Sequence, residues 1–466
     1  MNNSSYLFLA LLILVFGCNQ KESLKSEITV SGQLANSEEK IIEVFINDDI
    51  SSYPLDENGV FSIQFNSEDP ETYFFRSGKQ SFSLFLIPGD SVYVSGNADD
   101  FNNSFKLEGN HVVENTYLFD KSNFYYESNM MDLMSLGKEA YFEKKDAFFV
   151  EQKNRFEKLT SDNDLNPEFL KVEIAYFEYE PLLLDLYYPN YYAYTNNIQS
   201  EDVDFPAEAS NNKLSKVDLG RSDYLKSRSY TGILEVIIDK KKKEILNADP
   251  TLKSDPDSSE KATYLAMEDL LKNQSVKDHF HFKHVKSSLG YRGPVHVKPS
   301  IDKFMAENQS PKLEAEMKKA MDKWAPVMPG KEVPDFSFLD VSGKHINISD
   351  LRGTLVYIDI WATWCKPCIA EHPHWDRLKE EYKDKPVSFL TISIDEDKEA
   401  WEKMVDLKKM GGLQWLAENG WKSAITQHFF VSSIPRFIIL DKEGKIIDPS
   451  AERPSGNIRA TLDQFL

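Results

Sequence analysis

A C-x-x-C motif placed between a strand and a helix constrains this chain more than any other feature. The segment 354–360 is β-branched, aromatic and apolar, which predicts a buried strand, and 369–382 has the pattern of a helix. Cys365 therefore lies where a helix begins. Unpaired N–H groups and the helix macrodipole lower the pKa of a thiol there from about 8.5 to roughly 3.5–7.5. Cys368 follows one turn later, so the pair can close and open a small disulfide. The motif indicates redox chemistry.

Length and charge limit the other possibilities. A chain of 466 residues is too long for one core, so we expect two to four domains. A formal net charge of −21 argues against nucleic acid as a partner, because phosphates need basic patches. Of the three cysteines, Cys18 follows a targeting segment and the other two form the motif. None is left for a structural disulfide.

The N-terminus has the features of an export signal. Residues 1–17 carry an apolar run from Tyr6 to Phe16 that is too short to span a bilayer as a mature helix. The segment 15–18 resembles a bacterial lipobox, which predicts cleavage before Cys18 and its lipidation. The alternative is an ordinary cleaved signal with an incidental cysteine. Residues 18–27 would form a lipid-anchored tether.

Three regions follow the tether. Short strands bounded by turn formers predict a β-sandwich-like domain over 28–110, with 56–59 as a hairpin turn. Its motif order resembles the small β-domain that precedes thioredoxin domains in Bacteroidetes lipoproteins. Residues 111–327 are predicted to be mostly helical, with Pro181 and Pro189 breaking the aromatic helical segment 167–194. Residues 328–466 show a βαβ pattern followed by ββα, and form an α/β domain.

Other candidate sites outside the motif have simpler explanations. The aromatic stretch 176–194 could line a groove, but aromatic residues at helical spacing are more often core. The lysines 240–243 are typical of a solvated face. His279, His281 and His284 could bind metal, but no cysteine or paired acid joins them in the sequence, so we expect no metal site.

The last region resembles a known family. It carries Pro334-Asp-Phe336, Leu351-Arg-Gly353, Trp361-Ala-Thr-Trp-Cys-Lys-Pro-Cys368, Glu371-x-Pro373, Ile434-Pro435 and Leu440-Asp-Lys-Glu-Gly444. Over about 328–466 the chain resembles a thioredoxin-fold domain of the TlpA/ResA type, a family of exported thiol–disulfide oxidoreductases. The expected architecture is an α/β thioredoxin fold at the C-terminus, an all-β sandwich-like N-terminal domain and a mostly α middle.

Each motif residue then has an expected role. Cys365, partly exposed at the helix start, would be the attacking thiolate. Cys368, more buried, would resolve the mixed disulfide and re-form the Cys365–Cys368 bond. Asp359 stands where thioredoxins carry a buried acid, and Glu371 lies one turn beyond Cys368, as in the ResA-like pattern. Either carboxylate, if desolvated, could accept the proton of Cys368. The alternatives are an edge-exposed Asp359 and a surface Glu371.

The resemblance also implies a substrate-binding edge. Pro435 corresponds to the cis-proline of the fold, which would leave the Ile434 backbone free to pair with a substrate strand. Trp364 would offer an apolar platform beside the disulfide. Arg436 occupies a position where the family commonly has Thr, which puts the substrate preference in question.

Competing chemistries fit the residues less well. Ile369, not His, follows Cys368, so the c-type haem motif is absent. Zinc could be held by the two cysteines with His372 and His374, but helical geometry would strain such a site. Thiol peroxidase chemistry would want a Thr three residues before the cysteine. A non-enzymatic alternative is a lipid-anchored binding or assembly protein with an accessory redox domain.

The sequence therefore predicts a cell-envelope oxidoreductase, either facing the periplasm or attached to the outer membrane. It would exchange disulfides with protein substrates, and we expect it to act as a reductase without a cofactor. Its electrons would come from a membrane donor of the DsbD/CcdA type, and its membrane contact would be the lipid at Cys18. Apocytochrome c is one candidate substrate by analogy with the family.

Overall fold

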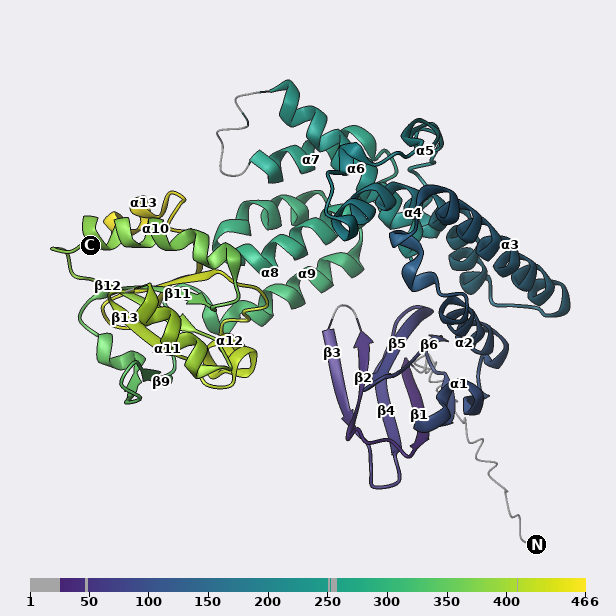
Figure 1. Ribbon diagram of the computed structural model, residues 1–466, viewed down its shortest axis with the longest axis horizontal. Coiled ribbons are helices and arrows are strands. Elements are labelled where there is room, and N and C mark those ends of the chain that lie inside the picture. Colours follow the sequence, from purple (N-terminus) through teal and green to yellow (C-terminus); the bar gives the residue numbers. More distant parts are fainter. Residues whose placement is uncertain (1–25, 47–48, 250–251, 253–257, 409) are drawn as a thin grey trace, which may run out of the picture. The chain divides into compact units, whose positions relative to one another are not determined.

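The computed structural model describes residues 26–46, 49–249, 252, 258–408 and 410–466 (Figure 1). The expected signal segment, the lipidation site Cys18 and nearly all of the tether lie outside these residues. Contacts between residues divide the chain into two units. The first holds residues 1–217 and 226–233, and the second holds 218–225 and 234–466. Within the described part, no helix combines the length and the apolar character that crossing a membrane requires.

The first unit begins with two four-stranded sheets, ordered β4-β1-β7-β8 and β3-β2-β5-β6. Burial alternates along β1, as expected for a strand with one face on a core. The buried faces of both sheets share one apolar cluster that includes Val30, Val44, Phe75 and Val94. The strands are β1 (Glu27–Ala35), β2 (Ile41–Ile46), β3 (Asp49–Pro54), β4 (Val60–Asn66), β5 (Glu71–Ser77), β6 (Gln80–Leu86), β7 (Ser91–Asn97) and β8 (Lys106–Gly109).

The turn at residues 56–59 forms, but the hairpin prediction for it is wrong. Asp56 caps the turn by accepting from the N–H of Val60 at 2.8 Å, and Gly59 has a φ of 74°. The strands on its two sides, β3 and β4, belong to different sheets. A tight turn therefore carries the chain across the sandwich, because the apolar faces of both strands must reach the same core.

Helices complete the first unit. They are α1 (Phe101–Ser104), α2 (Val112–Glu127), α3 (Lys138–Asp162), α4 (Pro167–Asn196) and α5 (Ala207–Leu214), and α6 (Arg228–Ala248) passes from this unit into the second. The prediction that Pro181 and Pro189 break the aromatic segment is wrong, because α4 runs through both. Buried side chains on either side of these prolines, among them Tyr179, Leu182 and Tyr188, hold the helix together by packing.

The second unit joins three further helices to the predicted α/β domain. The helices are α7 (Ser258–Leu270), α8 (Gln274–Glu307) and α9 (Pro311–Trp324). The α/β part contains β9 (Ser337–Asp340), β10 (His345–Asn347), β11 (Leu355–Trp361), α10 (Lys366–Glu381), β12 (Val387–Ser393), α11 (Lys398–Leu407), β13 (Leu413–Leu416), α12 (Ala424–His428), β14 (Arg436–Leu440), β15 (Ile446–Ala451) and α13 (Ile458–Phe465). Its sheet has the order β10-β9-β13-β12-β11-β14-β15. This is a thioredoxin-like arrangement in which β11 lies between β12 and β14.

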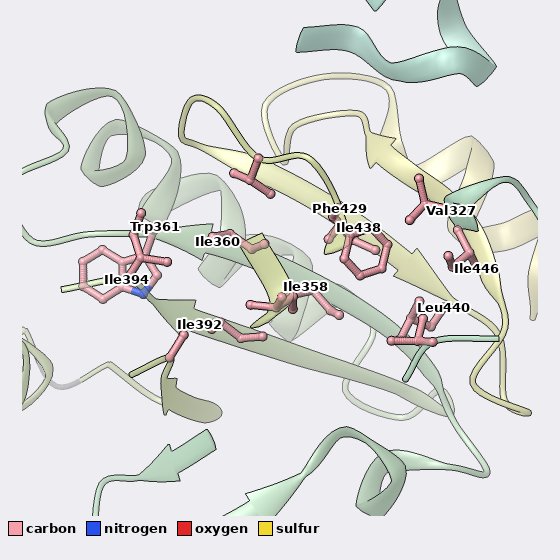
Figure 2. Close-up of a cluster of buried hydrophobic side chains, with 14 of the residues drawn as sticks. Val327, Ile358, Ile360, Trp361, Ile392, Ile394, Phe429, Ile438, Leu440 and Ile446 are labelled. Atoms are coloured by element: carbon pink, nitrogen blue, oxygen red, sulfur yellow. The ribbon is translucent and has the colours of Figure 1, made fainter. Parts of the chain in front are cut away.

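Both faces of this sheet are covered. On one face, Tyr357 and Phe437 pack with residues of α10 and α13. On the other, Ile358, Ile360, Ile392 and Ile438 form a continuous apolar layer (Figure 2). That layer belongs to the same core cluster as Val297, Ile301, Phe304 and Met317 of α8 and α9. The helices before residue 328 thus complete the core of the thioredoxin domain.

A break in α8 brings that helix against the sheet. Gly293 has φ 73° and ψ 168°, which are not helical, and Pro294 follows it. A Cβ on Gly293 would stand 2.6 Å from the Cβ of Ser450 on β15. His296 continues the contact, because its Nε2 lies 2.7 Å from Oδ2 of Asp448. The glycine therefore serves both to turn the chain and to let it approach the sheet closely.

Candidate active site

The two cysteines of the motif stand at the junction of β11 and α10. Their sulfur atoms are joined in a disulfide with an S–S distance of 2.03 Å. Cys365 is the N-cap residue of α10, and its sulfur accepts a hydrogen bond from the N–H of Cys368 at 3.2 Å. This N–H is one of the donors that a helix start leaves unpaired, so it would stabilise negative charge on that sulfur.

Both cysteines are buried, whereas the sequence predicted burial for Cys368 alone. Cys368 is fully buried, as predicted, but the prediction of a partly exposed Cys365 is wrong for this disulfide form. Cys365 packs into the same apolar cluster as Trp361 and Ala362, which covers it. Apolar side chains therefore shield Cys365 from solvent in the disulfide form.

Asp359 lies inside the domain on β11. It is buried, and its Oδ1 has no hydrogen-bond partner among the described protein atoms. Burial and, secondly, the negative charge of Glu371 raise the pKa of Asp359 well above its usual range. The edge-exposed alternative does not hold. A carboxyl group in this state can take up a proton near neutral pH.

Glu371 is also buried rather than a surface residue. It stands on α10, and Ser455 anchors it from beyond β15. The Ser455 N–H donates to one carboxylate oxygen at 3.0 Å and its hydroxyl donates to the other at 2.9 Å. Arg453 places a guanidinium nitrogen 3.9 Å away. Glu371 is thereby fixed as a charge close enough to influence Asp359.

The edge next to the disulfide carries the predicted proline. The Ile434–Pro435 peptide bond is cis. The antiparallel β11–β14 register ends with Ile360 opposite Arg436. Pro435 precedes Arg436, so it lies at the end of the sheet where β11 leads into the cysteines. Sheet topology thus brings Ile434, Pro435 and the disulfide to the same end of the sheet.

Comparison with known proteins agrees with this geometry. The sequence model of the Redoxin family matches residues 328–464. A thiol-disulfide oxidoreductase ResA of Bacillus thuringiensis subsp. konkukian is 34% identical over 137 residues, which is 29% of this chain and 76% of that protein. This chain belongs to the ResA-type thiol–disulfide oxidoreductases. The ResA of Bacillus cereus strain ZK is 34% identical over 26% of this chain and 67% of that protein. A solved thiol-disulfide oxidoreductase from Bacteroides fragilis is 27% identical, covering 29% of this chain and 100% of that one with a TM-score of 0.27.

Membership of the ResA-type family makes the chain an oxidoreductase with a thioredoxin-like domain at its C-terminus. The match does not extend to the β-sandwich or to most of the helices. Arg436 is the departure from the family pattern noted above. It is buried and donates from Nη2 to the backbone carbonyl of Gly290 on α8 at 3.1 Å. Burial lowers its pKa to about 10. In this oxidoreductase the residue after the cis-proline contacts α8.

A pair of tryptophans marks the exposed side of the oxidoreductase site. Trp364 is 57% exposed, and its ring centroid lies 6.2 Å from that of Trp421. Trp421, from the turn after β13, was not among the predicted site residues. No local signal separates it from an ordinary surface residue. Together the rings offer an apolar surface next to the motif.

Asp395 is a second residue that sequence reasoning missed. It is buried after β12, and it accepts hydrogen bonds from the Thr363 N–H at 3.0 Å and from the Thr363 hydroxyl at 2.7 Å. Ser393 donates to it as well, at 2.6 Å. Because Thr363 is two residues before Cys365, these bonds fix the loop that presents the reactive sulfur. Asp395 is a positioning residue, and the only signal for it was an acid at the end of a buried strand.

The zinc alternative at the motif gains no support. The His372 ring packs edge-on against Trp361 at 4.9 Å, and His374 contacts Arg377 at 2.8 Å. Among the described residues, these histidines do not converge with the two cysteines on a common point.

Proposed function

We propose that this oxidoreductase reduces protein disulfides in the cell envelope through the dithiol of Cys365 and Cys368. The observation that carries the proposal is the position of the Cys365 sulfur. It caps α10 and accepts a hydrogen bond from the Cys368 N–H, and β11, the strand that leads into the motif, carries the buried carboxyl group of Asp359. The helix start favours a thiolate at Cys365 at neutral pH.

The reaction proceeds in two thiol–disulfide exchanges. In the reduced enzyme, the Cys365 thiolate attacks one sulfur of the substrate disulfide. A mixed disulfide forms, and the other substrate sulfur leaves as a thiolate. Cys368 then gives its proton to a carboxylate and attacks the Cys365 sulfur. The Cys365–Cys368 bond forms, the second substrate thiolate is released, and two electrons have passed to the substrate.

The proton acceptor for Cys368 is assigned to Asp359. Its raised pKa and its unpaired Oδ1 suit a base inside the domain. Glu371 keeps Asp359 basic through its fixed negative charge, held by Ser455. The roles of the two acids therefore differ, although both are buried.

Substrate contacts follow the same edge. The Ile434 backbone before cis-Pro435 pairs with an extended substrate strand, and Trp364 with Trp421 receives its apolar side chains. A dithiol donor in the membrane, of the DsbD/CcdA type, returns the electrons. Lipidation at Cys18 would keep the enzyme near that donor, facing the periplasm or on the outer membrane. We also propose that the chain consists of a β-sandwich-like domain over 28–110, a helical region over 111–327 and a thioredoxin-like domain over 328–466.

Whether the protein reduces or oxidises its substrates is tested by measuring its reduction potential. The Cys365–Cys368 pair is equilibrated with glutathione buffers and the reduced fraction is measured by thiol alkylation. A reductase should lie near the roughly −270 mV of thioredoxin, and a value above about −150 mV, towards the roughly −120 mV of a strong oxidant, would overturn the assignment.

Activity is tested by insulin reduction with dithiothreitol. Wild type should accelerate the reaction and Cys365→Ala should not. Cys368→Ser should accumulate a mixed disulfide with insulin, visible by non-reducing electrophoresis. Equal rates for wild type and Cys365→Ala would favour the alternative of a binding or assembly protein.

A further inference from the structure

The break in α8 brings together residues that are far apart in the sequence. His281 and Glu307 are 26 positions apart, which would separate them by about 39 Å along a straight helix. At Gly293 the helix turns back on itself. The rings of Phe282 and Phe304 then lie 6.0 Å apart, and the Gln309 N–H donates to Asp278 at 3.0 Å. α8 is thus a helical hairpin whose two arms face each other.

Three possible metal ligands converge between these arms and α7. They are Glu268 of α7, His281 of the first arm and Glu307 at the end of the second. One ligand atom from each lies within 4.8 Å of the other two. His281 Nε2 and Glu268 Oε1 are 3.4 Å apart. Three separate segments therefore present one nitrogen and two carboxylates to a common point.

His281 gives the observation that separates this cluster from an ordinary group of surface acids. The residue is only 4% exposed, and its Nε2 has no hydrogen-bond partner among the described residues. This nitrogen points at the carboxylate of Glu268. A buried nitrogen without a partner costs free energy unless something else satisfies it.

The surroundings provide an outer layer of polar groups. Lys277 donates to Glu268 at 2.9 Å and Lys303 donates to Glu307 at 2.6 Å. The Tyr264 hydroxyl also bonds to Glu307, and the Tyr264 ring stacks on His281 with 4.7 Å between centroids. These contacts orient the two carboxylates and the imidazole, as outer groups do in metal sites. Each carboxylate oxygen keeps a further lone pair for an ion.

We propose that Glu268, His281 and Glu307 bind a divalent transition metal of the zinc class. Two ligands at about 2.1 Å from a tetrahedral zinc ion are about 3.4 Å apart, and that is the spacing of His281 Nε2 and Glu268 Oε1. One imidazole with two carboxylates suits such ions. Mg²⁺ and Ca²⁺ prefer six or more oxygen ligands. Water would complete the coordination, since the Glu307 side chain is half-exposed.

The ion would tie α7 to both arms of the hairpin. The same hairpin contacts the thioredoxin sheet through Gly293 and through His296 with Asp448. The ion would therefore be structural, and it would stabilise the helices that cover the oxidoreductase domain. This role is separate from the disulfide chemistry.

The test is a Zn²⁺ titration of the untagged full-length protein, followed by calorimetry. The Cys365–Cys368 disulfide is kept oxidised and the Cys18 thiol is blocked, so that no thiolate competes for the ion. Wild type should bind one Zn²⁺. His281→Gln, Glu268→Gln and Glu307→Gln should each weaken binding at least tenfold. His279→Gln, on the same helix but outside the cluster, should bind as wild type does.

Two further measurements keep the result decisive. Far-ultraviolet circular dichroism shows whether each variant is folded, and Glu307→Gln alters a half-exposed side chain. Zn²⁺ should also raise the thermal midpoint of tryptophan fluorescence in wild type but not in His281→Gln. Absence of binding to wild type, or equal binding by all variants, would overturn the proposal. Binding to several sites that ignores the substitutions would identify an adventitious ion and would overturn it too.

Discussion

Asp395 binds Thr363 through both the backbone N–H and the hydroxyl of that residue, across 32 positions of sequence. The contact couples the end of β12 to the loop that carries Cys365. The accepting carboxylate is buried, and hydrogen bonds to a carboxylate are stronger than those between neutral groups. Asp395 therefore helps to position Cys365 through Thr363, without an observed contact of its own to the sulfur.

Asp395→Ala should therefore alter the reactivity of Cys365 as well as stability. Loss of a buried acceptor leaves the Thr363 N–H unpaired and should cost about 1–3 kcal/mol of unfolding free energy. The alkylation rate of Cys365 in the reduced protein, measured against pH, should show a raised thiol pKa. Thr363→Val removes only the hydroxyl bond and should give a smaller change. An unchanged alkylation profile in Asp395→Ala would show that the loop keeps its geometry unaided.

Asp359→Asn should stabilise the oxidised protein, and increasingly so as the pH rises. The pKa of Asp359 is raised in the folded state, so the folded protein holds a proton that the unfolded chain has lost. Below about pH 4 both states are protonated and the variant gains nothing. Above it, wild type should lose about 1.4 kcal/mol per pH unit relative to the variant, until Asp359 itself ionises.

Urea unfolding from pH 3.5 to 8 measures this difference. Tryptophan fluorescence is a suitable probe, because all 7 tryptophans lie between Trp324 and Trp421, within the second unit. The exposed Asp384→Asn serves as the matched control and should run parallel to wild type. If Asp359→Asn also runs parallel to wild type, then the pKa of Asp359 is not raised in the folded protein, and the feature that assigned it as the base is absent.

Glu371→Gln should shift the pH–activity profile to lower pH. The negative charge of Glu371 helps to raise the pKa of Asp359, so its removal lowers that pKa. Activity that requires ionised Asp359 should then rise at a lower pH, seen in kcat/KM for insulin reduction. Ser455→Ala removes a hydrogen bond but keeps the charge, and its profile should not move to lower pH. A Glu371→Gln profile that coincides with wild type would assign Glu371 a purely structural role.

Trp421→Ala should weaken substrate binding without changing the sulfur chemistry. Its ring stands next to that of Trp364, away from the sulfur atoms in the observed contacts. We expect KM for an unfolded protein disulfide to rise several-fold, in line with about 1 kcal/mol for an aromatic contact. Rates with a small aromatic disulfide should be unchanged. Equal losses with both substrates would place Trp421 in the chemistry instead.

Gly293→Ala should destabilise the second unit by about 1–3 kcal/mol, because its φ of 73° strains other residues and a Cβ would collide with Ser450. Gly290→Ala is the matched control, three residues earlier with nothing within 4 Å of its Cβ. It should be neutral or stabilising. Equilibrium unfolding followed by tryptophan fluorescence distinguishes the two variants. Similar midpoints for both would mean that the helix break does not depend on glycine.

Local sequence patterns predicted much of the thioredoxin-like part. The strand expected over 354–360 forms at Leu355–Trp361, and the expected pairs of strands at both ends of the domain are present. The helix begins at Lys366 rather than at 369, because Pro367 fits a first helical turn and Cys365 caps it. These features depend on residues close together in the sequence, and for that reason local patterns could predict them.

Contacts between residues far apart in the sequence could not be predicted from local patterns. Ser455 lies 84 positions from Glu371, and neither segment has a local pattern that predicts their hydrogen bond. The sequence showed no acidic partner for the three histidines of α8, yet Glu268 approaches His281 from α7, and Glu307 approaches it because α8 turns back at Gly293. Pro181 and Pro189 of α4 gave a strong local signal for a helix break, but tertiary packing keeps the helix continuous.

The shared core of α8, α9 and the sheet has an evolutionary consequence. The family match starts at residue 328, but the apolar layer that the sheet needs starts with Phe282. A recombination event that joined this oxidoreductase to a new partner at 328 would remove the part of that layer supplied by α8 and α9. A breakpoint upstream of Phe282 would keep the shared core whole.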